Sequence, residues 1–331
     1  MVGFGEPWAG GYTDPARSIS QRSNYALREA VLAFARDKRQ GPTALVTQGA
    51  NPGLASCFVK RALINLAAGS GEALTRPQCP ESWAALAQRL GIRTIHIAER
   101  DTQTSVQRKR RKEFVNTWSV AGFICEGTQP SELGWGSHER HFPVDGARHG
   151  FGSDAAIYLN RPGMATRVRS WTPLEGPFHG FLVTHGESIS IADHLTLRKS
   201  GAVVHGPTVR YAYHPCDDAV LPMGHAGGVY WFGSRLSIEQ ARSLAPFNSA
   251  TSLQVAAGVL AGMVWVLAHP QAGVIEPDDM DHEAVLTIAS PYLGELVGVH
   301  GDWTPLQGRG QLFAEDMDTE DPWQFKNVRV L

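Results

Sequence analysis

Hydrophobic residues recur along the first third of the chain in two alternating patterns, one helical and one extended. Residues 24–38 place Leu27, Ala30, Val31 and Phe34 on one side, which predicts an amphipathic helix. Short apolar runs bounded by turn residues come after this segment, and such runs predict strands. The first third therefore alternates helices and strands, as α/β folds do.

A strand–turn–helix junction stands out in this part. The apolar run 43–47 leads into the turn Gly-Ala-Asn-Pro-Gly at 49–53, and a helical pattern follows at 52–68. We expect Asn51 to cap this helix, with Pro52 at its first position. Open α/β sheets bind ligands at such junctions. This turn is not a dinucleotide fingerprint, which would need a G-x-G-x-x-G turn on an earlier strand.

The later elements change in character. Helices are predicted at 82–90, from Ser237 to just before Pro246, at 253–268 and at 281–290, and strands at 94–99, 114–119 and 183–192. The Gly-, Pro- and Trp-rich tract 127–180 indicates a loop-rich antiparallel layer. Because extended segments dominate the later part, we predict an α/β part followed by an α+β part.

Composition narrows the class of protein. The 331 residues are 43% hydrophobic and 19% charged, with a formal net charge of -2. This balance argues against nucleic acid or an anionic membrane as a main partner. The segment 253–268 is shorter than the roughly 18–20 residues that span a bilayer, so we expect a buried helix.

The four cysteines, Cys57, Cys79, Cys125 and Cys216, are far apart and form no C-x-x-C pair. They suit free thiols in a reducing cytoplasm, and the start of the chain does not resemble a signal peptide. We therefore expect a cytoplasmic protein.

Three of the predicted strands end in polar residues, and these ends supply the candidate site. If the sheet is parallel, they converge on one crevice. Carboxylates, an indole and an imidazole there would suit a cation, because carboxylates supply charge and an indole supplies its π face. The candidates are Asn51, Glu99, Trp118, Glu126 and His185.

Each of these residues also has a purely structural interpretation. A tryptophan is more often part of a core than a ligand platform, and Glu99 can simply pair with Arg100. Other motifs are weaker: His138 and His141 lack a third ligand at metal spacing, so we expect no metal site. The basic run at 108–112 is typical of a solvated loop. No G-x-S-x-G elbow is present.

A family resemblance rests on several longer blocks. These are GANPG (49–53), HIAERDTQ (96–103), VNTWSVAGF (115–123), ELGWG (132–136), FLVTHGESISIAD (181–193), YAYHP (211–215), LAGMVW (260–265), EPDDMD (276–281) and DPWQFKNV (321–328). In this order, from about Glu6 to the C-terminus, the chain resembles bacterial homospermidine synthase, a relative of the saccharopine dehydrogenase fold.

The resemblance implies an incomplete Rossmann-like parallel sheet followed by a saccharopine-dehydrogenase-like catalytic and dimerisation domain. Family members begin with a Rossmann segment that carries the glycine-rich turn, and Glu6-Pro7-Trp8 resembles the residues directly after that segment. We expect residues 1–120 to be the remnant of that domain. Residues 121–331 would form the catalytic domain, with a C-terminal segment that returns to the first. The stretch 218–230 is shorter than in the family.

The implied reaction uses NAD as a hydride carrier. It moves an aminobutyl group from one putrescine to a second, through an imine and with loss of ammonia, and the implied assembly is a homodimer. Carried over by position, the residues that contact the cofactor would be Gly49, Ala50, Asn51 and Pro52. Asn51 would also contact the substrate. Glu99 and Glu126 would hold ammonium groups, Trp118 would give a cation–π contact, and His185 and Glu6 would line the pocket.

The chemistry fits these residue types. Hydride leaves only a carbon that bears a neutral amine, and deprotonating an alkylammonium at pH 7 costs about 4.6 kcal/mol. A carboxylate that grips the distant ammonium would orient the chain. Two alternatives stay open: a non-catalytic remnant that at most binds polyamines and dimerises, and a saccharopine-type amino-acid dehydrogenase. The second would need basic residues for substrate carboxylates, whereas the candidates are acidic and aromatic.

Overall fold

The computed structural model describes most of the chain. The described residues are 14–37, 41–71, 75–100, 106–107, 110–111, 119–213, 216–225, 227–311 and 313–330. The predicted strand at 114–119 falls almost wholly outside them, as does most of the basic run at 108–112.

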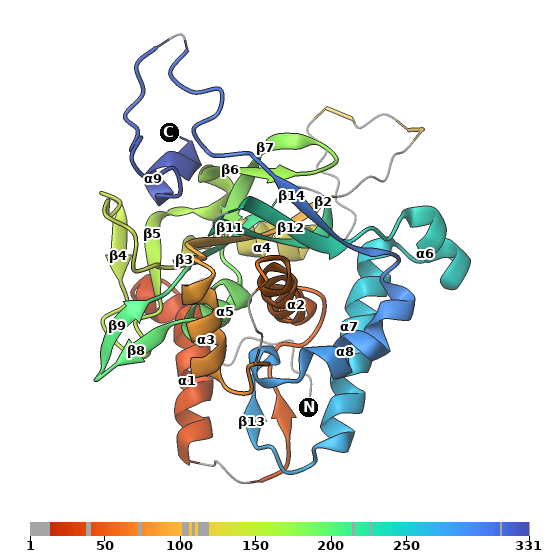
Figure 1. Ribbon diagram of the computed structural model, residues 1–331. Coiled ribbons are helices and arrows are strands. Elements are labelled where there is room, and N and C mark those ends of the chain that lie inside the picture. The colour runs from red at the N-terminus through yellow and green to blue at the C-terminus, as the bar shows by residue number, and fades with distance from the viewer. Residues whose placement is uncertain are drawn as a thin grey trace.

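Helices and strands alternate in the first part of the described chain, whereas the later part contains runs of consecutive strands (Figure 1). The α-helices are α1 (Asn24–Asp37), α2 (Leu54–Gly69), α3 (Pro80–Arg89), α4 (Val120–Thr128), α5 (Gly186–His194), α6 (Ile238–Leu244), α7 (Ala250–Ala268), α8 (His282–Ala289) and α9 (Phe325–Val328). The strands up to β7 are β1 (Ala44–Leu45), β2 (Thr94–Arg100), β3 (Pro130–Gly134), β4 (Gly146–Arg148), β5 (Ala156–Pro162), β6 (Arg167–Thr172) and β7 (Gly176–Val183). The later strands are β8 (Leu197–Lys199), β9 (Ala202–His205), β10 (Thr208–Tyr213), β11 (Cys216–His225), β12 (Gly228–Ser234), β13 (Val274–Ile275), β14 (Leu296–Gly301) and β15 (Arg329–Val330).

A mixed sheet, eleven-stranded over the described residues, forms the centre of the fold. Its main path is β14-β12-β11-β2-β10-β3-β5-β4, and β7 joins at β10 and continues through β6 to β15. Strands β2 and β10 are parallel, whereas the other pairs in this sheet are antiparallel. A separate parallel pair, β1 and β13, lies below the sheet in Figure 1. The predicted fold class, α/β followed by α+β, is confirmed.

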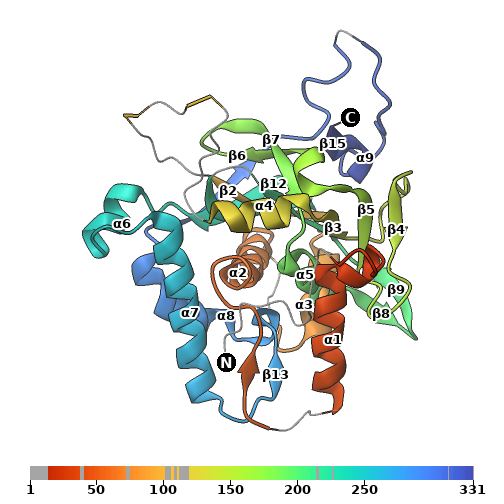
Figure 2. The same ribbon diagram turned by 180° about the vertical axis from the view of Figure 1, so that it is seen from behind.

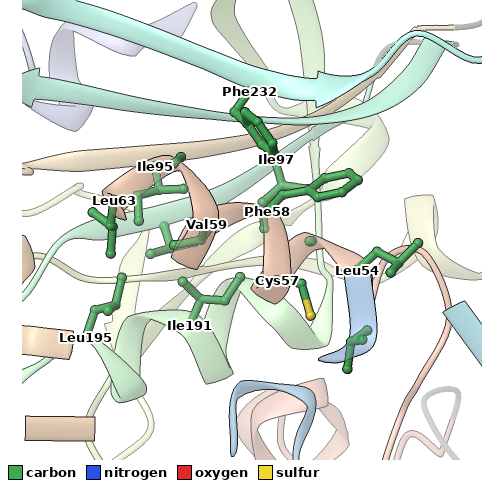
Figure 3. Packing of buried hydrophobic residues seen from close by; sticks show 14 of the residues in the cluster. Leu54, Cys57, Phe58, Val59, Leu63, Ile95, Ile97, Ile191, Leu195 and Phe232 are labelled. Atoms are coloured by element: carbon green, nitrogen blue, oxygen red, sulfur yellow. The ribbon is translucent and has the colours of Figure 1, made fainter. Parts of the chain in front are cut away.

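Helix α2 lies against one face of the large sheet and forms the centre of the main core, as the view from behind also shows (Figure 2). Its Phe58 ring packs edge-on to Phe232 of β12, with centroids 5.7 Å apart. Figure 3 shows Val59 and Leu63 of the same helix between Ile95 of β2 and Ile191 of α5. Because α2 is apolar on nearly all sides, it can be covered by the sheet above and by α5 and α8 below.

Two of the three strand ends from which the site was predicted lie in different sheets. Strand β1 pairs only with β13 among the described residues, through Ala44 N–H to Gly273 O (2.8 Å) and Val46 N–H to Ile275 O (2.9 Å). Strand β2 lies in the large sheet, antiparallel to β11. The common parallel sheet was therefore a wrong premise, since local pattern does not specify which strands pair.

The segment 183–192 was predicted as a strand and is a helix over most of its length. Strand β7 ends at Val183, and α5 begins at Gly186 with His185 as its N-cap. The alternation Ser-Ile-Ser-Ile is typical of a half-buried strand, but Ser188, Ile189 and Ser190 are all buried. A helix that is buried on every side does not need apolar residues at a 3.6-residue spacing. The hydrophobic pattern of this segment therefore gave the wrong prediction.

Helix α7 confirms the predicted helix at 253–268 but is only half buried. Its inner side packs Gly258 and Gly262 against the 45–49 segment. Its outer side exposes Leu260, Met263 and Leu267, the last at 79%. By length and composition α7 is the one helix in the described part of the chain that could cross a membrane, a test that core helices also pass.

Candidate active site

The turn at 49–53 is built from backbone hydrogen bonds. Gly49 N–H donates to Pro52 O (2.7 Å), Leu54 N–H donates to Gly49 O (3.0 Å), and the Asn51–Pro52 peptide is cis. Gly53 has φ +131°, and a Cβ there would lie 2.3 Å from Gly49 O, so only glycine fits. Gly53, rather than the predicted Asn51, is therefore the N-cap of α2.

Helix α7 supports this turn from behind. A Cβ at Gly258 would lie 2.1 Å from Gly49 O, and Gly258 O accepts from Gln48 Nε2 at 3.0 Å. The close approach of helix and turn therefore depends on glycine at position 258.

Gly258→Ala is expected to lower the free energy of unfolding by about 1–3 kcal/mol, because overpacking outweighs the better helix propensity of alanine. Thermal denaturation measures the loss. Gly69→Ala is the matched control, since nothing lies within 4 Å of its Cβ position at the end of α2. Equal melting temperatures for the two variants would contradict the expectation.

His185 and Glu187 form an acid–imidazole pair at the start of α5. His185 Nδ1 lies at hydrogen-bond distance from Glu187 Oε2, and both residues are buried, Glu187 to 1% exposure. Glu187 lies in the first turn of the helix, where the dipole favours negative charge. Its second oxygen, Oε1, is buried and has no hydrogen-bond partner among the described residues. A buried carboxylate oxygen without a partner is costly, and a bound cation would relieve that cost.

Tyr211 of β10 brings this pair together with the turn. Its ring stacks on His185 with centroids 4.4 Å apart and planes at 24°, and its hydroxyl accepts from Asn51 Nδ2 at 3.4 Å. Pro52 lies against the same corner, since a Cβ at Gly186 would lie 3.9 Å from its Cγ. The turn before α2 and the start of α5 therefore meet at one buried tyrosine.

Behind the pair, Glu132 of β3 fixes the loop that carries His185. It accepts from Thr184 Oγ1 (2.6 Å) and from the backbone N–H of Asn24 (2.8 Å) and Tyr25 (3.1 Å) at the start of α1. Burial raises the pKa of Glu132 despite these bonds. Its role is to join α1 to this loop.

The structure brings together some of the predicted site residues. Asn51 and His185 meet at Tyr211. Glu126 lies on α4, one turn from Phe123, whose ring packs on Tyr213 at 4.8 Å. Glu126 itself is half-buried, three residues after Phe123 in the same helix.

The other predicted residues cannot be placed. Trp118 and Glu6 lie outside the described residues, and Glu99 is described only as a position in β2.

Two residues of the site were missed from the sequence. Glu187 follows His185 by two positions, and an acidic residue just after a histidine and a glycine was the available signal. Tyr211 had no signal of its own, because its neighbours at the site are 26 and 160 residues away. Only the pairing of β10 with β7 and β2 places it there.

The predicted cofactor contacts divide into two kinds. Gly49 and Ala50 are buried and hold the turn, whereas Asn51 and Pro52 at its tip are partly exposed. Only these two could touch a cofactor through their side chains. Within the described part of the chain, no group of three His, Cys, Asp or Glu residues could hold a metal ion.

The fold and the site place the chain in the saccharopine dehydrogenase-like class: residues 49–229 match the family model described as "Saccharopine dehydrogenase C-terminal domain". Homospermidine synthase from Blastochloris viridis is 52% identical over 98% of this chain and 75% of its own length, and that from Mesorhizobium japonicum is 48% identical over the same shares. The chain belongs to the homospermidine synthase family.

A solved structure agrees. The crystal structure of homospermidine synthase from Legionella pneumophila in complex with NAD superposes with a TM-score of 0.89 at 47% identity, covering 94% of this chain and 74% of that one.

Proposed function

We propose that this enzyme transfers an aminobutyl group from one putrescine to a second, using NAD as a hydride carrier and releasing ammonia. The observation that supports this function best is the buried Glu187 carboxylate, which has one oxygen on His185 and the other without a partner among the described residues. In a chain of this family, such an oxygen suits the ammonium end of a diamine.

The residues of the site would divide the work by chemistry. Glu187 would hold one ammonium, and Glu126, Glu99 and Trp118 would hold further cationic groups nearer the entrance. Gripping the distant ammonium orients a flexible diamine and keeps the reacting amine away from carboxylates, so that it can lose its proton.

His185 would move that proton. Its Nδ1 lies at hydrogen-bond distance from the Glu187 carboxylate, and we propose that Nε2 takes the proton of the amine. Asn51 would hold the amine beside the cofactor, and Glu6 would line the pocket.

NAD, when bound, accepts a hydride from the diamine carbon and returns it to the imine. Asn51 and Pro52, at the partly exposed tip of the turn, are the residues we propose to contact it, with Gly49 and Ala50 as the frame. We further propose that residues 1–120 belong to the NAD-binding domain and residues 121–331 to the catalytic domain. The pairing of β13 with β1 supports a C-terminal return to the first domain.

Incubation of the 331-residue protein with putrescine and saturating NAD is expected to yield homospermidine and one ammonia per turnover, measured by chromatography and an ammonia assay. Light scattering is also expected to give the molecular mass of a homodimer. Putrescine binding by calorimetry without product would instead support the non-catalytic remnant. Turnover of amino acids in place of diamines would support the saccharopine-type dehydrogenase.

A further inference from the structure

One buried tyrosine contacts two site residues that come from different elements. Tyr211 is 2% exposed, its ring stacks on His185 at 4.4 Å, and its hydroxyl accepts from Asn51 Nδ2 at 3.4 Å. Asn51 stands before α2 and His185 is the N-cap of α5, so the two residues are carried by different helices. Tyr211 can set the distance between them because it touches both.

The ring of Tyr211 is held on several sides. Its backbone lies in the middle of the large sheet, opposite Ile97 of β2 and Val183 of β7. The centroid of its ring lies 6.1 Å from that of Tyr213, and the Tyr213 centroid lies 4.8 Å from that of Phe123 in α4. A side chain packed in this way has little freedom to change rotamer. This aromatic row (His185, Tyr211, Tyr213, Phe123) therefore joins the start of α5 to the helix that carries Glu126.

We propose that Tyr211 is a positioning residue of the aminobutyl transfer, an inference that rests on the function proposed above. Glu187 contacts the imidazole of His185 at Nδ1, and the Tyr211 phenol stacked on its face sets the plane of the ring. The Tyr211 hydroxyl holds the Asn51 amide in the same frame. Asn51 and His185 thereby meet the reacting amine in one fixed geometry, which is what a near-attack arrangement requires.

Two variants test the contributions of the Tyr211 hydroxyl and of its ring separately. Tyr211→Phe keeps the stack and is expected to lower kcat about 10-fold, the size of one lost hydrogen bond. Tyr211→Leu removes both contacts and is expected to lower kcat about 100-fold, since small misplacements are that costly. In both variants KM for putrescine should change by less than about threefold, because Glu187, the residue proposed to hold the ammonium group, is unaltered.

A matched control and a double variant exclude a merely structural role. Tyr230→Phe removes the same kind of bond, from Asn65 Nδ2 to a buried tyrosine hydroxyl at 3.0 Å, away from the site, and should leave kcat unchanged. Because Tyr211 is proposed to act through Asn51, Tyr211→Phe should cost nothing further in an Asn51→Ala background. Losses that multiply in the double variant would overturn the proposal, as would equal kcat values for Tyr211→Phe and Tyr230→Phe.

A second readout does not depend on turnover. Long-range proton–nitrogen NMR spectra should show His185 as a single Nδ1–H tautomer in the unaltered protein and in Tyr211→Phe, and a mixture in Tyr211→Leu. An unchanged His185 spectrum in Tyr211→Leu would overturn the positioning role. Absence of homospermidine from the unaltered protein would instead overturn the proposed function, and the spectra would still decide the role of Tyr211.

Discussion

Glu187→Gln is expected to lower kcat/KM for putrescine about 100-fold, equivalent to about 2.7 kcal/mol. Glutamine keeps the shape of the side chain and can still accept from His185 Nδ1, but it cannot neutralise an ammonium. Removing one partner of a buried charge pair costs about 2–5 kcal/mol, and Glu187 is 1% exposed. Steady-state kinetics at saturating NAD measure the loss.

A second buried glutamate provides the control for this variant. Glu139 accepts from Thr208 Oγ1 (2.6 Å) and from Phe325 N–H (2.8 Å), and burial raises its pKa, so a neutral glutamine should be tolerated there. Glu139→Gln should change the melting temperature more than kcat/KM. If both variants lower kcat/KM equally, or if Glu187→Gln is as active as the unaltered protein, the ammonium grip is not at Glu187.

Local chemistry explains which parts of the fold could be predicted. The helix predicted at 281–290 is α8, because Asp281 caps it by accepting from Glu283 N–H. The capping box of Ser237 and Gln240 starts α6 as expected. The residues that form a helix cap lie within a few positions of each other, so a cap can be recognised from the sequence without knowledge of the fold.

The sheet topology could not be predicted, because strand pairing is a long-range choice. Nothing in 94–99 indicates that β2 lies between β10 and β11, parallel to one and antiparallel to the other. The candidate site depended on these pairings. Asn51 and His185 do lie close together, but through Tyr211 of β10 rather than through the ends of adjacent parallel strands.

The site chemistry was predictable in type but not in full. Acidic and aromatic residues near Asn51 and His185 were expected, and the structure supplies Glu187 and Tyr211. Assigning 183–192 to a strand gave no role to Glu187, because the acid–imidazole pair forms only when the chain turns into α5 after His185.

The small parallel pair β1–β13 bears on how firmly this chain could hold NAD. Ala44 and Val46 direct their N–H groups to β13, so the intervening Leu45 presents its own N–H and C=O to the opposite edge, where the described residues provide no strand. Isolated two-stranded ladders are marginal, and parallel sheets are normally larger. The chain spans 75% of the length of the two homospermidine synthases.

For a protein made of these 331 residues alone we expect NAD to bind at least about 100-fold more weakly than to a homospermidine synthase that carries the glycine-rich turn, a difference of about 2.7 kcal/mol. Residues 1–331 contain no G-x-G-x-x-G turn, the motif that presents a helix N-terminus to a pyrophosphate. Calorimetry on both proteins measures the difference. Because the hydride must be returned to the imine, weak retention of NADH should also release unreduced imine to water. Micromolar affinity for NAD in this chain would contradict the prediction and would mean that the turn at 49–53 holds the cofactor largely alone.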